Sequence, residues 1–185
     1  MSNFAPLLER NRAYAAGRGR TEVPVIPRYL TFVIACLDPR VEPAAVLGIE
    51  LGDAIVVRNA GGRVTDAVIA DVALISSIGE AMGAGTGASP LEVAVIHHTQ
   101  CGTGFLADGG FRHAFAERTG LDEVALAAEA VVDPVATVRA DVERLLASPL
   151  ASGRICVSGH VHDLETGLVT TIVAPTAPYA VTASR

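Results

Sequence analysis

Three predominantly apolar runs, separated by segments with helical spacing, constrain the fold of this chain most strongly. The runs are Leu30–Ala35, Ala54–Val57 and Leu91–Ile96, and they are short and rich in β-branched or aliphatic residues. Such runs are typical of parallel strands that are covered on both faces. Because helical segments alternate with the runs, we predict an α/β fold with a mainly parallel central sheet flanked by helices.

The helical segments are identified by apolar residues at three- and four-residue spacing. We predict helices at residues 43–47, 66–78, 109–118 and 134–147, a helical centre within the ambiguous segment 121–132, a loop at 82–90 and a terminal pair of strands at 155–158 and 168–173. Thr65 is suited to cap the helix that follows it, and Pro134 to occupy a first helical turn. Residues 1–185 are predicted to form one domain.

An N-terminal helix is predicted over residues 2–19, with Ser2 as its N-cap and with Leu7 and Leu8 on a shared face. Residues 1–28 would then form a helical arm and a connector ahead of the first strand. A helix so far from that strand has little of its own domain to pack on. We therefore expect the arm to contact a second subunit.

The composition excludes several classes of partner. The net charge is −6 and no basic run occurs, so nucleic acid is not an expected partner. We expect neither a secretory signal nor a membrane span, because no apolar stretch has the required pattern or length. The three cysteines are an odd number and lie far apart, which argues against a disulfide framework and favours a reducing, cytoplasmic location.

Polar residues that could hold a metal follow the apolar runs. Cys36 comes directly after the first run, Asn59 follows the second, and His98 and Cys101 follow the third. In an open α/β sheet, such strand ends deliver their side chains to one edge. Two thiolates and one imidazole are three good zinc ligands, and the open fourth position is typical of a catalytic site.

Asp38 and Arg40 lie beside the first of these ligands and provide an acid–base group and its charge partner. With the three ligands, they indicate a zinc hydrolase or hydratase. The remaining histidines have simpler interpretations: His97 should point to the opposite face of its strand, and His160 and His162 are expected in surface or capping roles.

Three motifs resemble those of the β-class carbonic anhydrases: Cys36-Leu37-Asp38-Pro39-Arg40, Val56–Gly62 and His98–Gly102. The resemblance extends from about residue 30 to 105. It implies one Zn²⁺ per subunit, held by Cys36, His98 and Cys101, a catalytic pair formed by Asp38 and Arg40, and a homodimer or a dimer of dimers with the N-terminal helix packed on its partner. We also expect Asn59 and Gly102 to contact the substrate. Pro39 stands where the family usually has a small residue, and it should stiffen this loop.

The predicted activity is the zinc-dependent, reversible hydration of carbon dioxide to bicarbonate and a proton. Relatives with the same fold hydrolyse COS or CS₂, so these small molecules are alternative substrates. A catalytically silent zinc protein, closed by Asp38 on the metal, is a second alternative. A thiol redox protein that uses Cys36 and Cys101 is the third, and it would contain no zinc.

Overall fold

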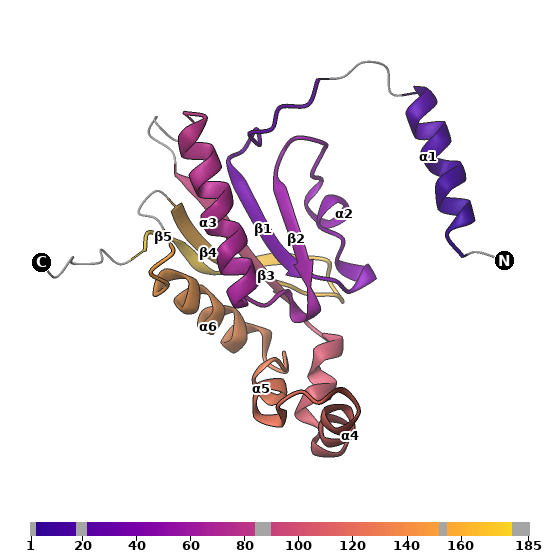
Figure 1. The fold of residues 1–185 in the computed structure, drawn as a ribbon, viewed down its shortest axis with the longest axis vertical. Helices are drawn as coiled ribbons and strands as arrows, with labels where there is room; N and C mark the ends of the chain where they lie inside the picture. Colours follow the sequence, from indigo (N-terminus) through magenta and orange to yellow (C-terminus); the bar gives the residue numbers. More distant parts are fainter. Residues whose placement is uncertain (1–2, 18–21, 84–89, 152–154, 179–185) are drawn as a thin grey trace, which may run out of the picture.

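The molecule is built around a five-stranded sheet with the strand order β2-β1-β3-β4-β5 (Figure 1). The computed structural model describes residues 3–17, 22–83, 90–151 and 155–178. The strands are β1 (Thr31–Cys36), β2 (Ile55–Asn59), β3 (Leu91–His98), β4 (Ile155–His162) and β5 (Val169–Thr176). The first four are parallel and β5 is antiparallel to β4. The predicted fold class is confirmed.

Several strands continue beyond their predicted apolar runs, and β3 and β4 do so side by side. β3 continues through His97 and His98, and β4 continues through Gly159 to His162. The two extensions pair with each other, with His97 opposite Val161 and His98 opposite His162. The predicted strands are too short because apolar periodicity indicates only which residues are buried in a core. The length of a strand depends on backbone hydrogen bonds to its neighbour.

The helices agree closely with the predicted segments. They are α1 (Ala5–Gly17), α2 (Pro43–Leu47), α3 (Asp66–Ala81), α4 (Gly109–Thr119), α5 (Glu123–Ala128) and α6 (Pro134–Leu146), with the short 3₁₀ turns η1 (Pro39–Val41), η2 (Ala60–Gly62) and η3 (Gly102–Ala107). Thr65 caps α3 as predicted, because its side chain accepts a hydrogen bond from the Val68 amide. α5 occupies the ambiguous segment, and of the predicted loop at 82–90, residues 84–89 lie outside the described part.

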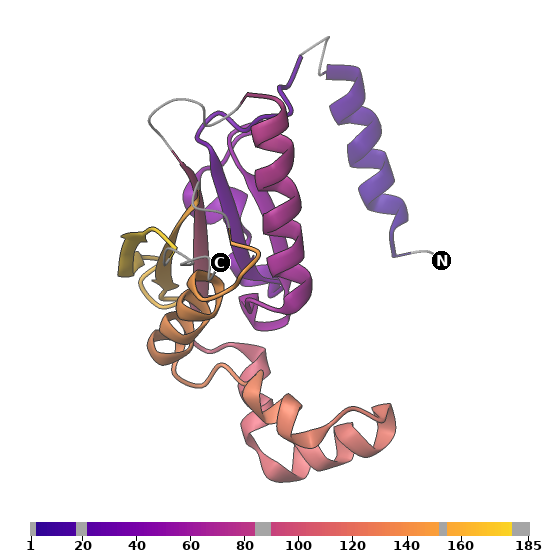
Figure 2. The same ribbon diagram turned by 60° about the vertical axis from the view of Figure 1, so that its left-hand side comes forward.

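The main core lies between the sheet and the helices α3 and α6, which cover one face (Figure 2). It contains buried residues from β1, β3, β4, α3 and α6, including Phe32, Ile34, Val72, Val93, Val95, Val138, Leu145, Ile155 and Val157. Each fully buried aliphatic or Phe side chain stabilises the fold by about 1.5–3 kcal/mol. The short helix α2 lies over the opposite face, where Val46 and Leu47 approach Ala35 and Ile96.

The helix α1 stands apart from the sheet in both views (Figures 1 and 2). All its residues are exposed, including Leu7 and Leu8. The predicted cap Ser2 and residues 18–19 lie outside the described residues. Among the helices that the structure describes, none is both long enough and apolar enough to cross a bilayer.

Candidate metal centre

The site forms at the carboxyl ends of the three neighbouring parallel strands. Cys36 is the last residue of β1, Asn59 the last of β2 and His98 the last of β3. Cys36 pairs with Asn59 across the sheet, and Cys101 follows β3 after a two-residue turn. The predicted convergence of strand ends is thus present, since parallel strands place equivalent ends at one edge.

Cys36, His98 and Cys101 form a cluster that could hold a metal ion. Their ligand atoms all lie within 4.8 Å of one another. The Cys36 and Cys101 sulfurs are 3.9 Å apart. Two Zn–S bonds of about 2.3 Å at a tetrahedral angle separate sulfurs by about 3.8 Å, so the spacing fits zinc. The residues are only 3%, 1% and 8% exposed, respectively.

The imidazole of His98 is oriented as a metal ligand. Its Nδ1 lies 2.9 Å from the Thr99 carbonyl oxygen, to which it donates when it carries the proton. Its Nε2 is buried and has no hydrogen-bond partner among the described residues. A buried nitrogen without a partner is costly unless another group satisfies it, and a cation between the sulfurs would do so. The donor set therefore fits Zn²⁺.

The contact between the two sulfurs shifts the pKa values of Cys36 and Cys101 in opposite directions. A hydrogen bond from Cys36 lowers the pKa of Cys101, and the same contact with its neighbour raises the pKa of Cys36. One proton between the sulfurs thus favours a thiolate at Cys101. A metal ion replaces such protons and stabilises both thiolates, which is the behaviour expected of cysteine ligands.

Asp38 and Arg40 form a closed ion pair beside the sulfurs. The Arg40 backbone amide and Nε both donate to Asp38 Oδ1 at 2.9 Å, and Arg40 Nη2 donates to Oδ2 at 2.6 Å. These bonds hold the pKa of Asp38 well below its usual range. Arg40 Nη2 also donates to the Gln100 carbonyl at 3.0 Å, which ties the pair to the loop between His98 and Cys101.

Arg58 is a functional neighbour that the sequence analysis did not identify. Its Nε donates to the Cys36 carbonyl at 2.9 Å, and its Nη2 donates to the Asp38 carbonyl at 2.8 Å. Its Nη1 pairs with Glu42. Arg58 therefore braces the backbone that carries Cys36 and Asp38. A charged residue inside an otherwise apolar strand is the signal that could have revealed it.

Pro39 lies in the first turn of η1, where Asp38 is the N-cap. Proline suits this position because the missing amide is one that a helix start leaves unpaired. Its ring also limits the backbone between Asp38 and Arg40. The expected stiffening of this loop is consistent with that position.

The turn after β2 packs directly behind the sulfur ligands. Gly61 and Gly62 have φ angles of +81° and +67°. A Cβ on Gly62 would lie 2.9 Å from the Cys36 amide nitrogen and 3.0 Å from the Ile96 carbonyl oxygen. Only glycine fits a left-handed conformation this close to two backbones.

The two residues expected to contact substrate occupy different surroundings. The amide side chain of Asn59 accepts from the Arg63 amide and donates to the Arg63 carbonyl, both at 2.8 Å, so it closes its own turn. Gly102 begins η3 directly after Cys101 and is exposed. Substrate contact by either residue stays a prediction.

A hollow opens beside Arg40 and is lined by Ala45, Val46, Gln100, His162 and Leu164. The mixed lining suits a small, weakly polar molecule.

The surface or capping role expected for His162 is wrong. It is 4% exposed and pairs in register with His98. His160 is half-buried and bonds to the hydroxyls of Ser158 and Thr171, so it is not a surface residue either. Both lie in the unpredicted extension of β4, which explains the error. His97 faces α6 as predicted, and its Nδ1 lies 2.8 Å from the Thr137 hydroxyl.

Comparisons with known proteins find similar sequences and structures over most of the chain. A family model described as carbonic anhydrase matches residues 31–108. The β-carbonic anhydrase 1 of Mycobacterium tuberculosis is 32% identical over 160 residues, which are 86% of this chain and 91% of that protein. The crystal structure of carbonic anhydrase from Streptococcus mutans is 32% identical, covers 93% of this chain and 98% of that one, and superposes with a TM-score of 0.78.

A shorter similarity links the chain to the carbon disulfide hydrolase of Acidianus sp., at 39% identity over 71 residues, which are 38% of this chain and 30% of that protein. The matches to the two carbonic anhydrases are longer, at 86% and 93% of this chain. This chain belongs to the β-carbonic anhydrase family.

Proposed function

We propose that the protein catalyses the reversible hydration of carbon dioxide to bicarbonate and a proton, with Zn²⁺ held by Cys36, His98 and Cys101. The observation that carries the proposal is the buried cluster of two sulfurs and one unpartnered imidazole nitrogen beside a carboxylate–guanidinium pair. Bound zinc lowers the pKa of water toward about 7, which makes hydroxide available near neutral pH.

Asp38 is suited to orient the reacting water. Its Oδ1 accepts two hydrogen bonds from Arg40 and its Oδ2 accepts one, so Oδ2 has more capacity to accept the proton of that water. A free aspartate with a pKa near 3.9 would already be ionised at pH 7. Arg40 therefore acts at neutral pH chiefly by fixing the position of the carboxylate, and less by keeping it ionised.

We expect Arg40→Ala to lower kcat/KM for CO₂ hydration by about 10- to 100-fold while zinc content stays at one ion per chain. Arg40 contacts none of the ligand atoms, but without it the Asp38 carboxylate can rotate toward the metal. Stopped-flow hydration and metal analysis on the same preparation test this. Arg144→Ala is the matched control, because the Arg144 side chain is similarly exposed, at 44% against 50% for Arg40, and pairs with Asp66 instead of Asp38. Equal loss of zinc and activity in Arg40→Ala would contradict the role.

Hydrolysis of CS₂ or COS is the second candidate function. It is favoured by the 39% identity over 71 residues to the carbon disulfide hydrolase. Stopped-flow CO₂ hydration and sulfide release from CS₂ and COS should be measured side by side. Sulfide release with a higher kcat/KM than CO₂ hydration would overturn the proposed substrate.

The CO₂ hydration assay also distinguishes an active enzyme from the catalytically silent zinc protein. That alternative requires Asp38 to coordinate zinc, whereas three hydrogen bonds from Arg40 hold its carboxylate. Stoichiometric zinc without CO₂ hydration, even at alkaline pH, would support the silent alternative. Reactive thiols without zinc would instead support the redox protein.

We also propose that residues 1–185 form one domain, and that residues 1–28 of it form an arm that packs on a second copy of the chain.

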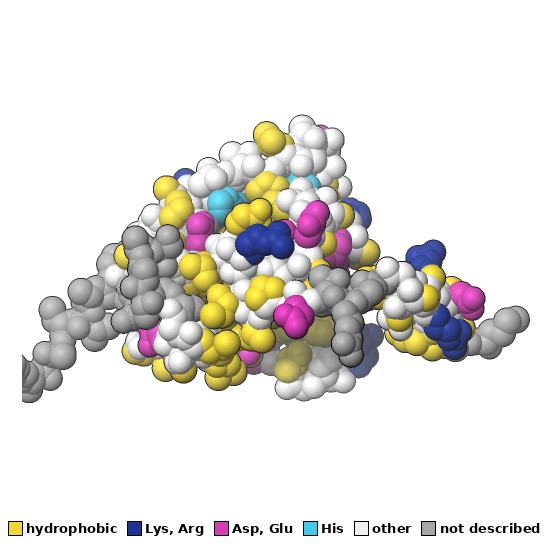
Figure 3. Space-filling model, turned by 90° about the horizontal axis from the view of Figure 1, so that it is seen from above, with side chains coloured by type: hydrophobic (Ala, Val, Ile, Leu, Met, Phe, Trp, Pro, Cys, Tyr) yellow, Lys and Arg dark blue, Asp and Glu magenta, His cyan; other side chains and the backbone are white. Residues whose placement is uncertain are grey.

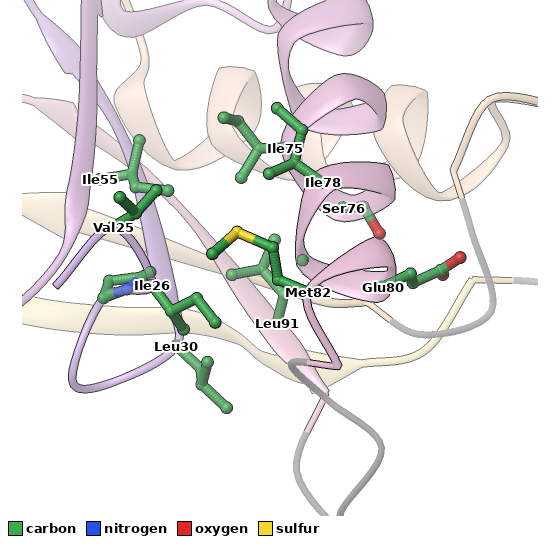
Figure 4. Close-up of a pocket in the computed structure, with 12 residues that line it drawn as sticks. Val25, Ile26, Leu30, Ile55, Ile75, Ser76, Ile78, Glu80, Met82 and Leu91 are labelled. Carbon is green, nitrogen blue, oxygen red and sulfur yellow. The ribbon is translucent and has the colours of Figure 1, made fainter.

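An apolar groove at the amino ends of the strands is a suitable docking surface for the arm of the second copy. It encloses about 120 Å³ and is lined by Val25, Leu30, Ile55, Ile75, Ile78, Met82 and Leu91, among others. Met82 reaches from the end of α3 toward Val25 across the groove (Figure 4). The groove is at the opposite end of the sheet from the ligands, so it is not the substrate site.

The arm and the groove share an apolar character. Leu7 and Leu8 of α1 are 49% and 45% exposed. In a view of the end with the groove, hydrophobic side chains gather on the body while α1 stands to one side (Figure 3). Burying both surfaces in a homodimer, or in a dimer of dimers, removes this apolar area from water.

We expect Leu8→Asp to raise the dimer dissociation constant by at least about 30-fold, the equivalent of 2 kcal/mol at an interface hot spot. Sedimentation velocity over a concentration series measures the change. Leu150→Asp alters a somewhat more exposed leucine outside the arm, at 56% against 45% for Leu8, and serves as the control. A wild-type dissociation constant in Leu8→Asp, or an equal change in both variants, would exclude the arm as the contact.

We place the protein in the cytoplasm. All three cysteines are free thiols, which is the state that a reducing compartment maintains. Measuring the enzyme in fractionated cells tests the location.

A further inference from the structure

A buried ion pair lies behind the turn that follows β2. Asp141, on α6, is 2% exposed. Its Oδ2 accepts from Arg63 Nε at 2.8 Å and from the Val64 amide at 3.0 Å, and its Oδ1 accepts from Arg63 Nη2 at 3.0 Å. These bonds hold the pKa of Asp141 low despite its burial.

An apolar residue would serve the helix–sheet packing at this position at least as well. The flanking core positions of α6 are Val138, Val142 and Leu145. Replacing a buried ion pair with apolar side chains is often neutral or stabilising, so general stability does not explain the charge. The geometry of the residues that Asp141 holds provides a more specific explanation.

Arg63 anchors the whole turn. Its backbone is bonded on both sides by the Asn59 amide, and its Nη1 donates to the Ala128 carbonyl at 2.7 Å. The Asp141 carboxylate therefore fixes the orientation of the segment from Asn59 to Val64 relative to α6.

This turn packs against Cys36 and against a residue that contacts Cys101. A Cβ on Gly62 would lie 2.9 Å from the Cys36 amide nitrogen, so the turn is in close contact with the Cys36 backbone. A Cβ on Gly61 would lie 3.2 Å from the Thr103 hydroxyl oxygen, so the turn packs closely against the Thr103 side chain. That hydroxyl is 3.2 Å from the Cys101 sulfur. A shift of the turn would therefore reach each of the two thiolates.

Asp141 also approaches the strand that carries the third ligand. His97 Nε2 lies 3.2 Å from Asp141 Oδ2, and its other ring nitrogen is held by the Thr137 hydroxyl of α6. His98 is the next residue of β3. One carboxylate thus restrains β3 beside His98 and the turn behind Cys36 and Cys101.

We propose that Asp141 is a positioning residue for the metal centre: through Arg63, Val64 and His97 it holds the two backbone segments that set the spacing of Cys36, His98 and Cys101. The inference rests on the metal site of the proposed function. Through Asp141, α6 would influence how firmly Cys36, His98 and Cys101 are held in place, although it is distant from them in the sequence.

We expect Asp141→Asn to release zinc about 10- to 100-fold faster, the usual effect of losing a partner of the ligand shell. Asparagine keeps the shape of the side chain, but its NH₂ group would face an N–H donor, so at least one of the hydrogen bonds to Asp141 is lost. The measurements are the zinc dissociation rate into excess chelator and the absorption spectrum of the cobalt(II)-substituted protein, which reports ligand geometry. We expect the cobalt bands of Asp141→Asn to shift or broaden relative to wild type.

Val142→Ala is the matched control, because Val142 is also 2% exposed and packs in the core beside Asp141. It should lower the melting temperature but leave the zinc dissociation rate within about twofold and the cobalt spectrum unchanged. Arg63→Lys is a milder variant that keeps the charge and loses the bidentate bond, and it should release zinc at an intermediate rate.

The outcomes separate the two proposals. A wild-type protein that binds no zinc would overturn the metal site itself. A wild type that binds zinc while Asp141→Asn, or Arg63→Lys if the former does not fold, retains the wild-type dissociation rate and spectrum would overturn the positioning role. Equal acceleration in Val142→Ala would also overturn it, since loss of core packing would then suffice.

Discussion

Cys36→Ala is expected to leave the protein without zinc and to reduce CO₂ hydration to the uncatalysed background, a loss of more than about 1,000-fold. The physical reason is the ligand count. Two remaining ligands hold zinc far more weakly than three, and the acidification of water, from a pKa of about 15.7 to about 7, is lost with the ion. The substitution removes one sulfur and leaves a methyl group in a buried position, so the fold should survive.

Cys156→Ala provides a matched control for this experiment. It makes the same chemical change at a cysteine of β4 that lies outside the cluster of ligand atoms. Metal analysis should find one zinc per chain in Cys156→Ala and less than about one-tenth in Cys36→Ala at equal protein concentration, given the coordination numbers of zinc sites. One retained zinc and normal hydration in Cys36→Ala would rule out the assigned ligand set.

Gly62→Ala should destabilise the protein by about 2–5 kcal/mol and disrupt the metal centre. The new methyl group would lie 2.9 Å from the Cys36 amide nitrogen and 3.0 Å from the Ala35 carbonyl carbon, both of which are backbone atoms in paired strands. Overpacking of this kind costs about 1–3 kcal/mol, and the left-handed backbone adds about 1–2 kcal/mol. Denaturant unfolding measures the loss, and metal analysis measures the effect on zinc.

Gly48→Ala isolates the backbone contribution. Gly48 has the same φ of +67°, and among the described residues no atom lies within 4 Å of a Cβ built on it. It should therefore lose only about 1–2 kcal/mol and keep full zinc content. If Gly62→Ala is no less stable than Gly48→Ala, the close contact behind Cys36 is not a constraint on this fold.

The ligand set could be predicted because its signals are local. Cys36 and His98 each follow an apolar run, and parallel strands bring equivalent ends together whatever the length of the connections. The Asp38–Arg40 pair is equally local, since two residues of spacing allow the guanidinium to reach the carboxylate. Neither inference required knowledge of the loops between the strands.

The errors arose where polar residues continue a strand. His160 and His162 were expected at the surface because the apolar run of β4 stops at Ser158. In the fold, backbone pairing with β3 extends the strand, and the His160 side chain contacts the Thr171 hydroxyl of β5. Periodicity in one segment cannot reveal a partner in another.

The sequence alone indicated the order of strands and helices along the chain, the cluster of Cys36, His98 and Cys101, and the Asp38–Arg40 pair. Burial periodicity and strand-end chemistry are encoded over a few consecutive residues. Only the tertiary structure decided that Arg58 braces the ligand backbone and that Asp141 holds Arg63, a residue 78 positions away. A buried charge is tolerated only where opposite charges and amides surround it. That environment exists only once α6 has packed against the sheet, so it cannot be predicted from any single segment of the sequence.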